Sequence, residues 1–413
     1  MNRYITQIHI NSLYHLRNID ITISEESSPH LIITGKNGSG KTVLLNAVSD
    51  YLDFIRTDKS LAFLDFRKHL EECRRIHSKT IDEAEKRKWE NHVNQWERRI
   101  DSLEGKVSLS FSNVTSLIDK YQEGSFILAF YQATRKPSLV EPKNPTKPEV
   151  EKQGLLKESA TSQFLNYLSD LKIQEALARN ENEIADADEI KRWFDEFESV
   201  LRKLFQDADL RLEFNYKDYS FHILTEGRSF KFTEVSDGFA AVLDIVMDLI
   251  LKMQVGSQNS LRTYQEEGIV LIDEIETHLH LGLQKAIMPF LTALFPKIQF
   301  IVTTHSPFIL SSMSNAVAFD LERKESIMDL TDYSYESLAE GYFGVRTPSS
   351  YMEMQIDDLH KLLEKNNKSG ADLLYLKQLI TDFEKIPEIV SPLIVGQYRQ
   401  LKSKYYDIIG PLL

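Results

Sequence analysis

Gly35-Lys36-Asn37-Gly38-Ser39-Gly40-Lys41-Thr42 stands between an apolar run, His30 to Thr34, and a segment with helical spacing, Val43 to Phe54. The octapeptide matches the pattern G-x-x-x-x-G-K-[ST] at every required position. In a strand, loop and helix arrangement, the glycines let consecutive backbone N–H groups turn towards a phosphate, and the helix start adds the positive end of its dipole. A chance Gly-rich turn is the alternative, and the flanking strand and helix argue against it. The stretch therefore predicts an α/β fold with a nucleotide site.

Each part of this loop has a predicted contact with the nucleotide. The Lys41 ammonium would reach the β- and γ-phosphates, and the Thr42 hydroxyl is placed to ligate Mg²⁺. We therefore expect ATP and Mg²⁺ as cofactors. The other residues that would line the phosphates are Gly35, Asn37, Gly38, Ser39 and Gly40.

A second apolar strand, Ile269 to Ile272, ends in two acids, Asp273 and Glu274. Asp273 would hold the Mg²⁺ through water, and Glu274 would polarise the attacking water as general base. Acids at a strand end can also form a solvated terminus or cap a helix. The phosphate loop in the same chain favours the catalytic interpretation.

A third strand, Gln299 to Thr304, is followed directly by His305. One predicted helix and this strand separate His305 from the two acids. A histidine at this position can sense the γ-phosphate, although a histidine at a strand end is otherwise an ordinary loop imidazole. The stretch Val235-Ser236-Asp237-Gly238-Phe239 precedes a predicted helix, Ala240 to Leu251. Ser236 or Asp237 could simply cap that helix. The same geometry can also bind a phosphate that arrives from another subunit.

Helical and proline-rich stretches separate these motifs. Asp58 to Glu104 contains neither glycine nor proline, and its apolar residues step by three and four, which indicates a helical insertion such as a short coiled-coil hairpin. Its closely mixed charges favour a solvated helix face over DNA binding. Four prolines between Pro137 and Pro148 indicate a mobile loop.

We expect seven segments: 1–56, a first ATPase lobe with the phosphate loop; 57–105, the helical insertion; 106–136, further ATPase strands; 137–160, a flexible Pro-rich loop; 161–209, a helical block; 210–320, a second ATPase lobe; and 321–413, a C-terminal helical region.

Composition limits the partners of the chain. Its 413 residues are 42% hydrophobic and 27% charged, as in ordinary globular proteins. The single cysteine, Cys73, excludes an internal disulfide, and no apolar run has the length of a membrane span or the form of a signal peptide. We therefore expect a cytoplasmic protein without a membrane partner. The net charge of −13 opposes a general attraction to nucleic acid, although a local basic groove could still exist.

Four motifs, taken in order, resemble those of ABC-type ATPases of the SMC, Rad50 and RecF kind: GKNGSGKT, VSDGF, IVLIDEIE and TTHS. More narrowly, the chain is similar to prokaryotic AAA-family ATPases allied to the OLD proteins and to antiphage ATPase subunits of the Septu and PARIS type. This similarity lies in Asp273-Glu274-Ile275-Glu276 and in His278-Leu279-His280, which follows closely. The resemblance covers roughly residues 1–56, 106–135 and 210–310. It implies an ABC/SMC-type ATPase head, a P-loop NTPase sheet with flanking antiparallel strands, with helical insertions and a C-terminal helical region.

The resemblance also implies a head-to-tail ATP sandwich. Ser236 and Gly238 of one copy would close over the γ-phosphate held by Lys41 of the other, so a homodimer or higher homo-oligomer would form through the ATP site. Gln132, after the strand Phe126 to Tyr131, would ligate Mg²⁺ and join the attacking water to the helical insertion, with a plain strand-end amide as the alternative.

Two departures from related families bear on the activity. Ser-Asp-Gly-Phe replaces the Ser-Gly-Gly-Gln of transporter ATPases, which disfavours transport. Full OLD nucleases carry a Toprim domain with metal-binding acids, whereas Asp357-Asp358 here falls inside a predicted amphipathic helix, so we expect no nuclease centre.

The resemblance favours an ATP-hydrolysing subunit of a bacterial antiphage complex that regulates a separately encoded effector, such as a nuclease or toxin. The alternative is a DNA repair or maintenance ATPase of the RecF or Rad50 kind that clamps DNA, although Phe63 to Leu103 is short for the coiled coil of such a protein. A P-loop kinase or a nucleotide-binding scaffold would need neither Ser236 nor a dimer.

Overall fold

Three strands that are buried along both faces form the centre of the first of two structural units: β3 (His30–Thr34), β9 (Glu267–Ile272) and β10 (Ile298–Thr303). The computed structural model describes residues 4–23, 30–57, 66–135, 139–143, 156–256, 264–327, 338, 350–387 and 392–412, and the chain divides into units 1–335 and 336–413. Strands covered on both faces read as continuous apolar runs, which is why the sequence shows them so clearly.

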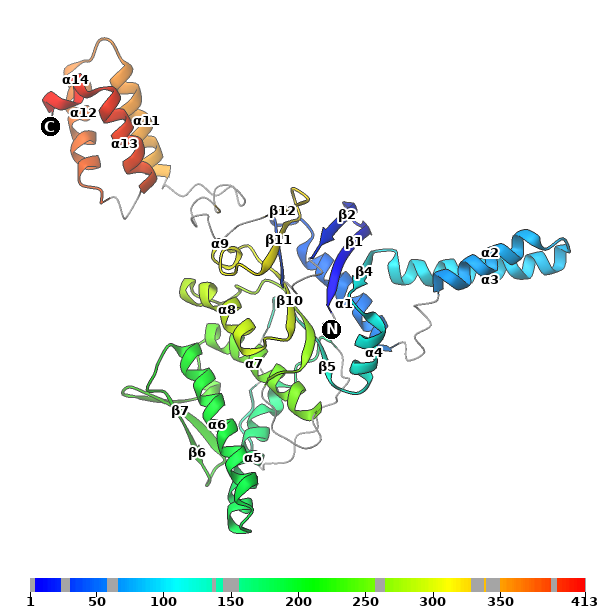
Figure 1. The fold of residues 1–413 in the computed structure, drawn as a ribbon. Helices are drawn as coiled ribbons and strands as arrows, with labels where there is room; N and C mark the ends of the chain where they lie inside the picture. Colours follow the sequence, from blue (N-terminus) through cyan, green and yellow to red (C-terminus); the bar gives the residue numbers. More distant parts are fainter. Residues whose placement is uncertain are drawn as a thin grey trace. The chain divides into compact units, whose positions relative to one another are not determined.

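These strands belong to a six-stranded sheet with the order β12-β11-β3-β10-β9-β5 (Figure 1). Its other members are β5 (Phe126–Tyr131), β11 (Ala316–Asp320) and β12 (Glu325–Ile327). All strands are parallel except β12, which pairs antiparallel with β11. The carboxyl ends of β3, β5, β9 and β10 therefore meet along one edge, where ligands bind in open α/β sheets.

A second sheet, antiparallel and ordered β2-β1-β4, covers the helix that follows the phosphate loop. Its strands are β1 (Ile5–Leu13), β2 (Leu16–Thr22) and β4 (Val107–Phe111), and the helix is α1 (Lys41–Thr57). Buried residues of α1 share one hydrophobic cluster with residues of both sheets. The phosphate loop is thus anchored from two sides.

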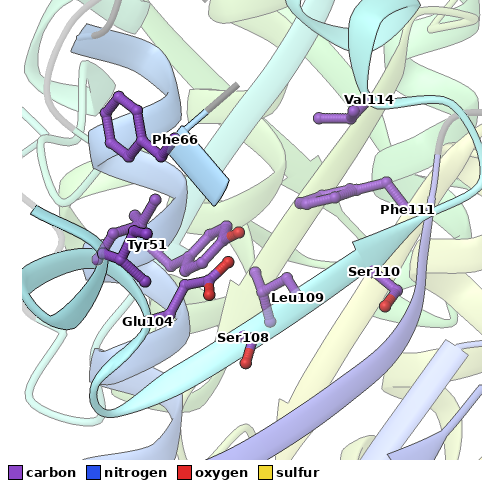
Figure 2. Close-up of a pocket in the computed structure, with 10 residues that line it drawn as sticks. Tyr51, Phe66, Glu104, Ser108, Leu109, Ser110, Phe111 and Val114 are labelled. Carbon is purple, nitrogen blue, oxygen red and sulfur yellow. The ribbon is translucent and has the colours of Figure 1, made fainter. Parts of the chain in front are cut away.

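The predicted helical insertion is a hairpin of α2 (Phe66–Lys79) and α3 (Glu83–Glu104), which lie side by side (Figure 1). Asp82 caps α3 by accepting a hydrogen bond from the N–H of Glu85, so the bend of the hairpin lies between Lys79 and Glu83. A cavity of about 280 Å³ lies where the hairpin joins the core, with Tyr51 and Leu109 pointing towards one another in its wall (Figure 2).

Helices and a small sheet complete the first unit. The antiparallel sheet β6-β7-β8 packs with α5 and α6 around an aromatic cluster that includes Phe164, Trp193, Phe197 and Phe221. The bounds of these and the remaining elements are α4 (Val114–Gln122), α5 (Phe164–Asn180), α6 (Ile184–Phe205), β6 (Arg211–Asn215), β7 (Ser220–Thr225), β8 (Arg228–Lys231), α7 (Asp237–Gly256), α8 (Leu281–Leu294) and α9 (Pro307–Leu310).

The second unit is a helical bundle with a hydrophobic core of its own, which includes Leu359, Leu376 and Ile394. Its helices are α11 (Ser350–Glu364), α12 (Gly370–Glu384), α13 (Pro392–Lys404) and α14 (Tyr406–Ile409). In the parts of the chain covered by the structure, no helix is long and apolar enough to span a bilayer.

Two details differ from the sequence-based expectations. The strand β12 lies inside 321–413, which was expected to be helical throughout. Of the Pro-rich loop 137–160, only 139–143 and 156–160 lie within the described residues; Leu156 there is buried, and its carbonyl accepts a hydrogen bond from the N–H of Phe130 at 2.8 Å. The end of that stretch is therefore packed on the edge strand β5.

Candidate functional site

The phosphate loop has the backbone that its glycines predict. Gly35, Gly38 and Gly40 have φ angles of 136°, 81° and 100°, a region that residues with a side chain rarely adopt. A Cβ at Gly40 would come within 2.9 Å of the Leu16 side chain, because the turn between β1 and β2 lies against the loop. The buried Ser39 hydroxyl has no hydrogen-bond partner in the part of the chain that is described, so it is a polar group available to a phosphate oxygen. The loop therefore fits a phosphate.

Lys41 lies inside the loop that it follows. Its ammonium is buried and donates to the carbonyl oxygens of Gly35 at 2.7 Å and Lys36 at 3.1 Å. Burial lowers the Lys41 pKa, while the negative charges of four carboxylates, with Glu274 and Glu276 foremost, act in the opposite direction. A cation surrounded by acids in this way is suited to a polyphosphate with its metal ion.

Thr42 and Asp273, which are 231 positions apart in the sequence, meet at the carboxyl edge of the sheet. The Thr42 hydroxyl donates to Asp273 Oδ1 at 3.2 Å, and the Thr303 hydroxyl donates to the same oxygen at 2.6 Å. Asp273 is only 2% exposed, so its orientation is fixed. A hydroxyl beside a rigid carboxylate is the donor set that Mg²⁺ takes next to nucleotide phosphates.

Glu274 follows Asp273 in a left-handed conformation, with φ of 44°. Its N–H donates to the Thr303 hydroxyl at 2.8 Å, and its Oε2 accepts from the Thr277 hydroxyl at 3.5 Å. The side chain is only partly buried. The carboxylate can therefore contact a water molecule at the sheet edge.

His305 lies near the same acids and is held by Glu276. The Glu276 carboxylate accepts a hydrogen bond from the His305 backbone N–H and another from the Thr304 hydroxyl at 2.8 Å. Burial lowers the His305 pKa, the Lys41 charge lowers it further, and the charges of Glu274 and Asp273 raise it. The imidazole is therefore neutral at neutral pH and available as a hydrogen-bonding group.

Gln132 reaches the same edge from the neighbouring strand. Tyr131 pairs with Ile272 across β5 and β9, and its carbonyl accepts from the Asp273 N–H at 2.8 Å. Gln132 is the next residue, and it is exposed. It is thus placed beside Asp273, where a metal-bound water would lie.

Ser236 and Gly238 stand at the start of α7. Ser236 is exposed, and a Cβ on Gly238 would come within 2.8 Å of the His278 carbonyl oxygen, so this helix start packs on the turn that follows the acids. Within the described residues, no hydrogen bond joins either residue to the phosphate loop 35–42 of the same chain. The site assembled in one copy thus comprises Lys41, Thr42, Asp273, Glu274, His305 and Gln132.

Sequence reasoning gave no role to Glu276, Arg135 or two buried acids on α7, Asp244 and Asp248. The acids had a readable signal, because they interrupt an otherwise apolar helix at positions i and i+4. Asp248 accepts from the Tyr131 hydroxyl at 2.7 Å. Arg135 had no such signal, since its contacts depend on the tertiary fold.

The residues that the structure covers, those of the phosphate site included, contain no group of three or more His, Cys, Asp or Glu side chains that could hold a metal ion. This is compatible with Mg²⁺, which keeps several waters and binds through one or two protein groups together with substrate phosphates.

Comparison with known proteins gives consistent findings. The family model described as "AAA domain, putative AbiEii toxin, Type IV TA system" matches residues 31–311. The Septu protein PtuA of Bacillus mycoides (strain KBAB4) is 24% identical over 401 residues, which cover 93% of this chain and 51% of that protein. The "Retron Ec83 probable ATPase" of Escherichia coli is 39% identical over 82 residues, which cover 20% of this chain and 15% of that protein. The chain thus spans about half the length of the first relative and a smaller part of the second.

Among solved structures, the crystal structure of the SMC head bound to the C-winged helix domain of ScpA aligns with 78% of this chain and 96% of that chain. The sequence identity is 14% and the TM-score is 0.38.

Proposed function

We propose, on the premise that this chain belongs to the AAA-domain family whose model matches residues 31–311, that it is the ATP-binding and ATP-hydrolysing subunit of a bacterial antiphage complex. The observation that carries the ATPase part is the meeting of Thr42 with Asp273 at 3.2 Å, beside Lys41 and Glu274. The buried lysine and the hydroxyl follow β3, the two acids follow β9, and all four groups lie at the same edge of the parallel sheet. This is the arrangement that phosphoryl transfer to water requires.

Each residue has a task in this chemistry. Thr42 and Asp273 would hold Mg²⁺, with Gln132 beside them, and the ion when bound neutralises charge on the phosphates. Lys41 would bind the β- and γ-phosphates through its ammonium. Glu274 would accept the proton of the attacking water, and the neutral imidazole of His305 would contact the γ-phosphate.

The second part of the proposal is that a second copy completes the site. Ser236 is exposed at the start of the 20-residue helix α7, whose N-terminus is suited to an anion. Ser236 and Gly238 of one copy would close over the γ-phosphate held by Lys41 of the other. ATP would then control assembly.

The third part concerns the effector. The relatives are named as a Septu protein and a probable retron ATPase, and we propose that the nucleotide-dependent assembly of this chain restrains or releases a separately encoded nuclease or toxin. Co-purification of such a protein with the chain, dependent on ATP, is the expected observation.

Lys41→Ala tests the ATPase assignment. Removing the ammonium should abolish ATP binding and phosphate release, because a charge-assisted contact to the phosphates is lost. Phosphate release from ATP and Mg²⁺ by the purified chain is the measurement, with Lys285→Ala on α8 as a control outside the proposed site. Equal phosphate release by wild type and Lys41→Ala would contradict the assignment. Strong stimulation by duplex DNA would indicate a DNA clamp instead of an effector-regulating ATPase.

A further inference from the structure

A buried arginine lies directly behind the catalytic acids. Arg135 follows β5 and is 8% exposed. Its Nη1 donates to the carbonyl oxygen of Asp273, and its Nη2 donates to those of Glu274 and Ile275, all at 3.4 Å. One guanidinium therefore contacts three consecutive carbonyls of the turn that presents the acids, which a single ammonium could not do.

The turn needs such support because its backbone is strained. Glu274 is left-handed, a conformation that costs a residue with a side chain free energy and persists only where the surroundings enforce it. Thr303 fixes the Glu274 N–H from one side, and Arg135 contacts the Glu274 carbonyl from the other. The direction of the Glu274 carboxylate depends on both contacts.

The charge of Arg135 is balanced from a different element. Burial lowers its pKa, and the opposing effect comes first from Asp244 on α7, then from Glu276 and Asp273. Asp244 is itself 4% exposed and accepts from the Ser159 hydroxyl at 3.4 Å. The negative charge of Asp244 therefore favours the charged form of the buried guanidinium.

We infer that Arg135 is a positioning residue that holds the catalytic turn Asp273–Ile275 in its strained conformation through the contacts of its guanidinium with three carbonyl oxygens. Because Arg135 is buried, it acts on the reaction through Glu274 and does not contact the nucleotide. The inference concerns the same site as the proposed ATPase function and rests on it for the catalytic consequence. Whether Arg135 holds the turn can be tested even if the chain does not hydrolyse ATP.

Hydrogen exchange and steady-state kinetics on the full chain test this inference, with Arg135→Met and Arg135→Lys as variants. Arg192→Met is the matched control, because Arg192 is exposed on α6. Arg135→Met should speed amide exchange in peptides covering 273–279 by about 10-fold or more, since it frees carbonyls of a turn in which the amides of residues 273, 274, 275, 277 and 279 are hydrogen-bonded. It should lower kcat about 10- to 100-fold with KM for ATP nearly unchanged, as expected for a misplaced base.

The other variants separate positioning from folding. Arg135→Lys keeps the charge but can reach fewer carbonyls, so it should give intermediate exchange and an intermediate kcat. Arg192→Met should match wild type in both measurements. If Arg135→Met does not fold, the Arg135→Lys result decides.

Folded variants with wild-type exchange at 273–279, or with faster exchange but wild-type kcat, would overturn the inference. Absence of ATP hydrolysis by the wild-type chain would instead contradict the proposed function. The exchange measurement would still decide whether Arg135 holds the turn.

Discussion

Glu274 differs from the other residues of the site in that its backbone is strained while its carboxylate is free to contact water. Its φ of 44° is enforced by Thr303 and Arg135, and among the residues that the structure describes its carboxylate accepts a single long contact, from Thr277 at 3.5 Å. Strain of this kind is found where surrounding groups fix a functional side chain. This placement makes Glu274 the residue to test as general base.

Glu274→Gln should preserve ATP binding while it slows hydrolysis, because the amide keeps the shape of the side chain but cannot accept the proton of water. A loss of general-base catalysis corresponds to about 10²- to 10⁴-fold in rate. The ATP-bound dimer should live correspondingly longer. Single-turnover phosphate release and the lifetime of the dimer after dilution measure these effects, with Glu213→Gln as the exposed control. Rapid turnover by Glu274→Gln would remove Glu274 as the base.

The residues around Lys41 could be predicted from sequence because their geometry is local. The phosphate loop is one continuous octapeptide, and its glycine spacing alone fixes the positive φ angles. Arg135 could not be predicted, because its contact with Asp273 joins residues 138 positions apart. Glu276 was visible in the sequence as the last acid of Asp273-Glu274-Ile275-Glu276, but its hold on His305 became evident only when β9 and β10 were placed side by side.

At the level of elements, strands were predicted where both faces are buried and missed where the strand is short. The bounds of β3 and β5 agree with the expectation because nearly every residue in them is apolar. β12 has three residues, Glu325–Ile327, too few for any alternation to be read. Length does not explain why β11 was not predicted, because this strand has five residues, as many as β3, with which it pairs.

The pairing of β3 with β10 includes a buried histidine that links stability to pH. His30 is 6% exposed, and its Nδ1 accepts a hydrogen bond from the Phe300 N–H at 3.1 Å. Burial lowers the His30 pKa from 6.5 to about 4. The folded state therefore binds a proton less readily than the unfolded chain, so the stability present above pH 6.5 is lost progressively as the pH falls from 6.5 towards 4.

His30→Asn should reduce this pH dependence, because an Asn side-chain oxygen can replace Nδ1 as acceptor and does not titrate. At pH 5 the protonation of His30 in the unfolded chain corresponds to about 2 kcal/mol. The free energy of unfolding in urea, compared between pH 7.5 and pH 5 for both proteins, is the measurement. The loss on acidification should be smaller in the variant by roughly that amount, and identical losses would contradict the assignment to His30.

At the scale of the whole molecule, the nucleotide groups lie in the first unit, while 336–413 has a separate helical core. One copy brings together the phosphate loop, the acids and His305, and it leaves Ser236 exposed. Because the net charge is −13, two copies repel one another at long range. A specific contact filled by the nucleotide would be needed to hold them together. The proposed sandwich is therefore expected to depend on ATP.

Mixing two inactive variants tests directly whether two copies share each site. Lys41→Ala removes the phosphate contact but keeps Ser236, and Ser236→Arg keeps Lys41 but blocks the surface expected to close over the γ-phosphate. Each variant alone should be inactive. Mixed in equal amounts they should recover about one quarter of the wild-type ATPase rate, because half of the dimers would be mixed and each would carry one intact site. Full activity of Ser236→Arg alone, or no recovery on mixing two folded variants, would contradict a site shared between two copies.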